Sequence, residues 1–221
     1  MTTDCRVKVI GAGLAGCEAA LQLAQNGVAV DLYEMRPNKT TGAHSTQNPA
    51  EFVCSNSLGS IDPTNASGLL KQEMSILGSF LIQVAHEVKV PAGNALAIDR
   101  ELFSQKVEQL LQEHNINIIR EEVKTIPQEG PVILASGPLT SADLAEDIKS
   151  FTGSEHLHFF DAIAPIVEKD SINFDKAFYA SRYDKGEASY INCPMNKEEY
   201  ENFYRILTTC LLYTSDAADE L

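Results

Sequence analysis

The stretch VKVIGAGLAGCEAALQLAQNGVAVDLYE, from Val7 to Glu34, constrains the fold of this chain more than any other feature. A short apolar run leads into three glycines with the pattern G-x-G-x-x-G. A segment with helical spacing follows, and then a second apolar run that ends in an acidic residue. This order predicts a strand, a helix and a parallel second strand, which together form the first βαβ unit of an α/β domain.

The three glycines, Gly11, Gly13 and Gly16, answer three different needs of a dinucleotide site. The first allows a tight turn, the second lets the backbone approach a pyrophosphate, and the third lets helix and strand pack closely. Free N–H groups at the start of the helix then face the phosphates. The predicted cofactor-binding residues of this turn are Gly11, Ala12, Gly13, Leu14, Ala15 and Gly16. The alternative is that the glycines serve only a tight turn.

Glu34 closes the second predicted strand, where an acid binds a ribose hydroxyl. An acid at this position disfavours a 2′-phosphate, so we do not expect NADP in this crevice. The glycines do not decide between FAD and NAD. Their N-terminal position favours FAD, and so does a later apolar run that ends in Ser136 and Gly137. That run also suits an ordinary strand-to-helix turn with Ser141 as N-cap.

The rest of the chain alternates between predicted helices, strands and one long polar segment. The segment from Arg36 to Thr64 is long for a loop without structure, which indicates a functional role. Near Ser150 the pattern changes to alternating, aromatic-rich runs that predict β structure in a second domain. The other predicted elements are helices at Ala66–Glu87, Asp99–His114 and Asn196–Leu207 and strands at Ile116–Ile126 and Val132–Ala135. In the first of these helices, Leu69, Leu70 and Leu77 are among the residues predicted to face the core.

Composition restricts the classes of function. The formal net charge of -14 argues against a broad basic surface for nucleic acid in this stretch of chain. Five scattered cysteines make a poor disulfide framework and indicate reduced thiols in the cytoplasm. No cluster has the spacing of a metal site, so no metal is predicted. No apolar run approaches the roughly 20 residues that a membrane span needs.

Several longer blocks carry a more specific signal. They are EMRPNKTTGAH, AEFVCSNSLGS, GLLKQEM, VPAGNALAIDRELF, ILASGPLTS, FFDAIAPIV, SRYDKGE and YINCPMNKEEYENF. Together with the glycine turn, these blocks resemble the folate- and FAD-dependent tRNA uracil-5-methyltransferases, the TrmFO family. The resemblance runs from Val7 to about Thr209. A sister flavoenzyme family that modifies wobble uridines in tRNA shares the glycine turn but not the later blocks.

The resemblance implies a truncated flavoprotein of the glutathione-reductase-like type. Residues 1–148 would form the N-terminal part of a Rossmann-like FAD-binding domain, and residues 149–209 the beginning of an inserted α+β domain for substrate and tRNA. Family members are roughly twice as long. Residues 210–221, CLLYTSDAADEL after Thr209, do not continue the family and resemble adapter sequence more than protein.

The implied reaction makes ribothymidine in the T-loop of tRNA in the bacterial cytoplasm. Methylenetetrahydrofolate is the one-carbon donor, reduced FAD is carrier and reductant, and NADPH or NADH re-reduces the flavin. The partners are therefore tRNA and folate, with no membrane and no metal. We expect the fragment alone to be inactive. The alternatives are another FAD-dependent oxidoreductase, a wobble-uridine-modifying flavoenzyme, or a non-catalytic nucleotide-binding fragment.

Individual residues take their roles from the matching motifs. Cys54, in FVCSNS, stands where the family has a cysteine close to the flavin, and we predict that it is catalytic. Its alternative role is that of a small buried hydrophobe. Arg36, in EMRP, is predicted to lie beside the adenosine part of FAD, and Ser136 and Gly137 complete the predicted cofactor-binding set. His44 lies in the polar segment near the expected site.

Overall fold

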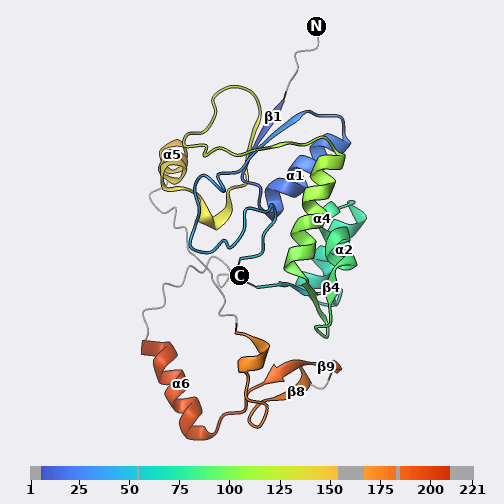
Figure 1. Cartoon of the computed structure of the whole chain (residues 1–221), viewed down its shortest axis with the longest axis vertical. Helices are drawn as coiled ribbons and strands as arrows, with labels where there is room; N and C mark the ends of the chain where they lie inside the picture. The colour runs from blue at the N-terminus through green and yellow to red at the C-terminus, as the bar shows by residue number, and fades with distance from the viewer. Residues whose placement is uncertain (1–5, 54, 154–166, 183–184, 210–221) are drawn as a thin grey trace. The chain divides into compact units, whose positions relative to one another are not determined.

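The computed structural model describes residues 6–53, 55–153, 167–182 and 185–209. The chain divides into two compact units, residues 1–164 and residues 165–221, and each is described by itself (Figure 1). Helix α5, Ala142–Thr152, crosses the position between residues 148 and 149 where the family resemblance places a domain boundary, and it belongs to the first unit. That functional boundary stays a prediction.

A four-stranded parallel sheet forms the centre of the first unit. Its order is β6, β2, β1, β7, formed by Ile118–Ile119, Val30–Tyr33, Val7–Ile10 and Val132–Leu134. All three neighbouring pairs run parallel, which requires crossover connections between them. With β1 central and the order reversing beside it, this is the arrangement of a Rossmann-like domain. The predicted α/β fold is confirmed.

Helices bury the apolar face of this sheet. Helix α1, Leu14–Gln25, confirms the predicted helix after the glycines, and α4, Arg100–Glu113, confirms the predicted helix from Asp99 to His114. The side chain of Asp99 accepts hydrogen bonds from the backbone N–H groups of the first turn of α4, as an N-cap does. α1 and α4 lie side by side in Figure 1, with α5 apart from them. The core joins strand and helix residues, among them Val9, Leu21, Leu32, Phe103 and Val107.

The predicted helix from Ala66 to Glu87 is wrong as a single element. The structure has two helices, α2 at Ala66–Ile76 and α3 at Phe80–Glu87. They are separated at Gly78, whose φ of 77° is a left-handed conformation that ends a helix. The hydroxyl of Ser79 then accepts a hydrogen bond from the N–H of Ile82 and caps the new helix. The apolar periodicity continues across the break, so periodicity alone could not show it.

Helix α2 also faces differently from the prediction. Leu69, Leu70 and Leu77 are exposed, at 46%, 56% and 79% of their surface, instead of facing the core. The residues of α2 that are buried are Gly68 and Lys71. The helix packs beside a small antiparallel sheet with the order β3, β5, β4, formed by Ser57–Ser60, Ala95–Ile98 and Lys89–Val90. The polar segment that follows Arg36 therefore contains a short strand.

The strand predicted from Ile116 to Ile126 is much shorter in the structure. Only Ile118–Ile119 pair with β2, and the chain beyond them runs without regular structure to β7. After β7, Gly137–Leu139 form a single 3-10 turn, η1, that leads into α5. Both irregular segments lie at the end of the sheet where β1 and β2 also finish, and they become walls of the pocket described below.

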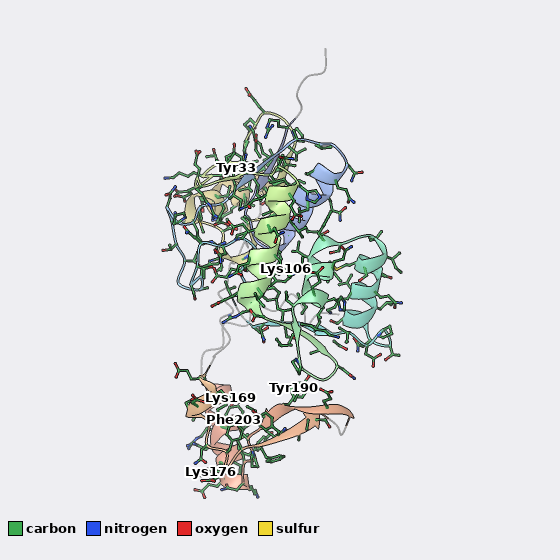
Figure 2. All side chains as sticks on the ribbon, turned by 45° about the vertical axis from the view of Figure 1, so that its right-hand side comes forward. Tyr33, Lys106, Lys169, Lys176, Tyr190 and Phe203 are labelled. Carbon is green, nitrogen blue, oxygen red and sulfur yellow. The ribbon has the colours of Figure 1, made fainter. Side chains whose placement is uncertain are left out.

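The second unit has its own simple organisation. A 3-10 turn, η2 at Lys169–Ser171, precedes an antiparallel hairpin of β8, Phe178–Arg182, and β9, Lys185–Asn192. Helix α6, Lys197–Thr209, confirms the predicted C-terminal helix. Asn196 caps it: Asn196 and Glu199 exchange hydrogen bonds of 2.9 and 2.8 Å. Figure 2 shows Tyr190 and Phe203 in this unit. Across the described parts of the chain, no helix combines the length and the apolar character that a membrane crossing needs.

The contact between α1 and α3 gives a first testable expectation. The carboxylate of Glu18 accepts hydrogen bonds from the hydroxyl of Ser79 and from the N–H groups of Phe80 and Leu81, so it caps α3 from another helix. We expect Glu18→Ala to lower the free energy of unfolding by about 2 kcal/mol, because orphaned N–H groups at a helix start are costly. Urea denaturation measures the change. Glu87→Ala, which removes only an exposed ion pair with Lys106, should change it by less than about 1 kcal/mol.

Candidate functional site

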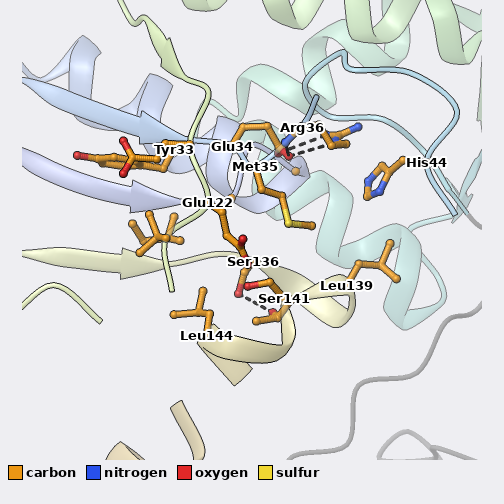
Figure 3. Close-up of a pocket in the computed structure, with 16 residues that line it drawn as sticks. Tyr33, Glu34, Met35, Arg36, His44, Glu122, Ser136, Leu139, Ser141 and Leu144 are labelled. Carbon is orange, nitrogen blue, oxygen red and sulfur yellow. Dashed lines mark hydrogen bonds and ion pairs between the residues drawn. The ribbon is translucent and has the colours of Figure 1, made fainter. Parts of the chain in front are cut away.

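A pocket opens where β1, β2 and β7 end, at the edge of the sheet where α/β proteins of this type bind ligands (Figure 3). It encloses about 550 Å³ of empty space, part of it open to solvent. Its lining comes from the glycine turn, the end of β2, the polar segment, the irregular chain after β6 and the turn after β7. The lining residues are Ile10, Gly11, Gly13, Tyr33, Glu34, Met35, Arg36, His44, Glu121, Glu122, Val123, Ser136, Leu139, Thr140, Ser141 and Leu144.

The three glycines of the turn have distinct surroundings. A Cβ on Gly11 would lie 2.6 Å from the carbonyl oxygen of Ala135 in β7's continuation, and Gly11 has a φ of 102°. A Cβ on Gly16 would lie 1.8 Å from the carbonyl oxygen of Gly11, so helix and turn are in direct contact there. A Cβ on Gly13 would meet nothing within 4 Å. The open side of the turn is therefore at Gly13, at the start of α1.

The start of α1 is a set of backbone donors. The first hydrogen bond inside the helix runs from the N–H of Cys17 to the carbonyl of Gly13. The N–H groups of Leu14, Ala15 and Gly16 precede it, and helix geometry gives them no acceptor within the helix. These N–H groups lie at the positive end of the helix dipole, which attracts anions. This part of the pocket can hold a phosphate group.

Glu34 lies beside the turn, immediately after β2, and is 6% exposed. Its Oε2 accepts a hydrogen bond from the N–H of Ala12 at 3.2 Å, and its Oε1 accepts one from the N–H of Arg36 at 3.0 Å. Burial opposes ionisation of this carboxyl, but the hydrogen bonds from Arg36 and Ala12 outweigh burial and hold the pKa of Glu34 below its usual range. The side chain of Glu34 is therefore a carboxylate at neutral pH. It can accept a hydrogen bond from a hydroxyl group, but it repels a phosphate.

Arg36 is the largest of the fully buried side chains described in the chain, at 2% exposure. Its Nε donates to Glu34 Oε1 at 3.0 Å, and its Nη1 donates to Glu51 Oε2 at 2.8 Å and to the carbonyl of Thr46 at 3.1 Å. Figure 3 shows the guanidinium against Glu34. Arg36 thus lines the pocket while its charge is shared by two carboxylates. Sequence reasoning placed Arg36 near the site but missed Glu51, because no periodicity or motif spacing marks it.

Two further arginines hold the polar segment against the sheet domain. Arg120 Nη1 donates to the carbonyl oxygens of Arg36 at 3.1 Å and Gln47 at 2.8 Å. Arg100 Nη1 donates to the carbonyl of Phe52 at 3.1 Å. The N–H of Ala50 also donates to the carbonyl of Ala12 at 2.8 Å, which ties the segment to the glycine turn itself. Residues 36–52 of the predicted functional segment are therefore held beside the glycine turn, and Arg36 and His44 from them line the pocket.

The other predicted residues of the site have separate positions. Ser136 lines the pocket, and its Oγ accepts a hydrogen bond of 2.7 Å from the hydroxyl of Thr140. Gly137 adopts a φ of 66° in the following turn. His44 also lines the pocket, and its Nδ1 is hydrogen-bonded to the hydroxyl of Thr41 at 2.7 Å. The turn after β7 and the polar segment thus meet the glycine turn in one pocket.

The cysteines contribute little that the structure can assign. The predicted catalytic residue, Cys54, lies outside the described residues. Cys17 is fully buried beneath the glycine turn, where burial raises its pKa to about 12, so it is an unreactive thiol at neutral pH. In the described ranges no group of three or more His, Cys, Asp or Glu side chains is placed to hold a metal ion.

Comparisons with known proteins add to this geometry. A family model described as "Glucose inhibited division protein A" matches residues 6–212. The "Methylenetetrahydrofolate--tRNA-(uracil-5-)-methyltransferase TrmFO" of Sulfurihydrogenibium sp. (strain YO3AOP1) is 55% identical over 203 residues, which cover 91% of this chain and 46% of that protein. The protein of the same name from Dictyoglomus thermophilum is 57% identical over 199 residues, 90% of this chain and 45% of that protein. The chain therefore spans about half the length of these relatives.

Among solved structures, GidA of Aquifex aeolicus matches with a TM-score of 0.48 and 18% sequence identity. The match covers 61% of this chain and 25% of that one. The strand order of the sheet defines the fold independently of this match.

Proposed function

Because this chain belongs to the glucose inhibited division protein A family, we propose that residues 6–209 form the N-terminal half of a folate- and FAD-dependent tRNA uracil-5-methyltransferase. The names of the relatives that are 55–57% identical over 90–91% of the chain support this choice within the family. The observation that carries the cofactor assignment is the pocket in which the open glycine turn, a buried carboxylate and the turn after β7 meet.

The residues of this pocket fit the adenosine diphosphate part of FAD. The pyrophosphate would lie over Gly13 and bind the N–H groups at the start of α1, where a Cβ would meet nothing and there is space for a ligand. A ribose hydroxyl would donate to the carboxylate of Glu34. Ser136 also lines the pocket and lies against the glycine turn, since a Cβ on Gly11 would be 2.8 Å from its Cα. Glu121 and Glu122 add negative charge to the lining, which further disfavours the 2′-phosphate of NADP in this crevice.

In the proposed reaction, reduced FAD would supply the reducing equivalents and carry the one-carbon unit from methylenetetrahydrofolate towards C5 of uracil. The chain described here binds and orients that cofactor through residues 1–148 and begins an inserted substrate domain in residues 149–209. Cys54, which follows residues 36–52 of the polar segment, is the proposed catalytic thiol. NADPH or NADH as reductant and a cytoplasmic location complete the proposal, in keeping with five scattered cysteines.

A hybrid enzyme tests this function directly. Residues 6–209 would replace the matching half of the Sulfurihydrogenibium relative, to which the chain is 55% identical. The purified hybrid would be incubated with an unmodified tRNA transcript, methylenetetrahydrofolate and NADPH, and the nucleosides analysed by mass spectrometry. We expect ribothymidine in the T-loop that depends on the folate. The Cys54→Ala hybrid should bind FAD but form no ribothymidine.

The product also separates the rival functions. A hybrid that contains FAD and modifies only the wobble uridine would point to the sister tRNA-modifying activity. A hybrid that oxidises NADPH but modifies no tRNA, while the unaltered relative does, would contradict the proposal and favour another flavin-dependent oxidoreductase. A hybrid that takes up no FAD would refute the cofactor assignment itself.

A further inference from the structure

We propose that Glu51 is a positioning residue for ribose recognition, because it shares the cation of Arg36 with Glu34 and so allows a ribose hydroxyl to replace one Arg36 donor on Glu34. This inference rests on the proposed function, because it needs a nucleotide with a ribose diol in the pocket. Glu51 is joined in one buried ion group to Arg36 and, through it, to Glu34. The side chains of Glu34, Arg36 and Glu51 are 7%, 2% and 11% exposed.

The carboxylate of Glu34 has no acceptor position left over. Its Oε1 accepts from the N–H of Arg36 at 3.0 Å and from Arg36 Nε at 3.0 Å. Its Oε2 accepts from the N–H of Ala12 at 3.2 Å and from Arg36 Nη2 at 3.3 Å. A carboxylate offers about four lone-pair positions, so these four donors fill it. A ribose hydroxyl can bind Glu34 only by replacing one of them.

The donor easiest to replace is Arg36 Nη2, which makes the longest of the four contacts. Replacing it would leave the guanidinium held to Glu34 by Nε alone. Glu51 compensates for this, because its Oε2 already accepts from Nη1 of the same guanidinium at 2.8 Å. Because two carboxylates share one cation, Arg36 does not fully neutralise Glu34, and the remaining negative charge can attract a ribose hydroxyl.

Glu51 is itself fixed, so it cannot follow Arg36 towards Glu34. Its Oε1 accepts from the N–H of Ser45 at 2.8 Å, and its Oε2 accepts from the hydroxyl of Thr46 at 2.9 Å. These contacts anchor Glu51 in the polar segment, where it contacts Arg36 through Nη1 while Glu34 contacts Nε and Nη2. Without the charge of Glu51, Arg36 would pair with Glu34 alone, and its Nη2 would compete with the ribose hydroxyl for Oε2.

The test compares ADP with 2′-deoxyadenosine 5′-diphosphate by titration calorimetry on the purified chain. The deoxy compound lacks the hydroxyl that would bind the charged carboxylate, so we expect the wild type to bind ADP at least about tenfold more tightly than the deoxy compound. Glu51→Gln keeps the size of the side chain but removes its charge, and should reduce that ratio to about twofold. Glu51→Asp restores the charge with a shorter reach and should give an intermediate ratio.

Arg120→Met is the matched control, because it loosens the same polar segment without touching the two carboxylates. It should change both affinities by the same factor and leave the ratio near tenfold. An unchanged ratio in Glu51→Gln, or a fall in the ratio of Arg120→Met as large as in Glu51→Gln, would overturn the inference while the nucleotide site stands. If Glu51→Gln does not fold, the Glu51→Asp ratio decides, and a wild-type value there overturns the inference. A wild type that binds neither nucleotide would overturn both the inference and the cofactor assignment.

Discussion

Replacing Arg36 with methionine is expected to lower the free energy of unfolding of the first unit by about 3–5 kcal/mol. The change leaves the carboxylates of Glu34 and Glu51 buried without their shared cation, and breaking a buried ion pair from one side has this order of cost. Methionine preserves much of the packing volume, so the loss would come from charge and not from a cavity. Urea denaturation at pH 7 measures it.

The pH dependence of this variant gives a second readout with a defined sign. In the wild type the pKa of Glu34 is lowered from 4.5, so its contribution to stability is present above about pH 4.5 and is lost as the pH falls through the lower, folded value. Arg36→Met removes the side-chain hydrogen bonds and the positive charge that lower the pKa of Glu34, keeps the backbone N–H donors of residue 36 and Ala12, and leaves the burial that raises it. The destabilisation should therefore shrink between pH 7 and pH 5. A deficit that is the same at both values would contradict the assignment to buried charge.

Lys39→Met serves as the control for this change. Lys39 also pairs with a glutamate that lines the pocket, Glu122, but 41% of its side chain is exposed. A partly exposed ion pair contributes little, so the loss should stay below about 1 kcal/mol. A loss in Lys39→Met as large as in Arg36→Met would show that burial of the group around Arg36 is not what makes it important.

The second large effect is expected for Gly16→Ala. The added Cβ would lie 1.8 Å from the carbonyl oxygen of Gly11, which is backbone and cannot rotate away. Either α1 or the turn must shift, and such overpacking costs about 3 kcal/mol or more. We expect a loss of stability in thermal denaturation together with a loss of FAD binding, because the displaced turn also carries the N–H groups for the pyrophosphate.

Gly13→Ala is the matched substitution, with the same added atom three residues away. Its Cβ would meet nothing within 4 Å, and its φ of -77° suits alanine. The variant should lose only about 1 kcal/mol for the poorer N-cap, but it should bind FAD at least tenfold more weakly, since the Cβ occupies the space assigned to the pyrophosphate. A Gly13→Ala protein that binds FAD like the wild type would place the phosphates elsewhere.

The sequence predicted the sheet domain well because its signals are local. The glycine turn, helix α1 and the acid after β2 depend on spacing within one βαβ unit. The break at Gly78 could not be predicted from apolar spacing. It depends on a cap supplied by Glu18, which lies 61 residues before Ser79 in the sequence.

The remaining part of the site depends on contacts between distant segments. Sequence analysis could place Glu34 and Arg36 near a nucleotide, but it gave no sign that Glu51 would share Arg36 with Glu34. It also predicted Leu69 and Leu70 as core residues, although α2 turns them outwards and buries Lys71 instead. In both cases a local pattern is compatible with several tertiary environments, and only packing selects one.

The absorbance spectrum of the purified chain, with any bound nucleotide released by heat and identified, tests most directly whether the pocket is a flavin site. We expect a flavin spectrum and close to one FAD per chain, either as purified or after addition of FAD. Gly13→Ala should lose the bound flavin and remain folded. A folded wild-type chain that neither contains nor takes up FAD, or that releases a different nucleotide, would contradict the claim that this pocket is a flavin site.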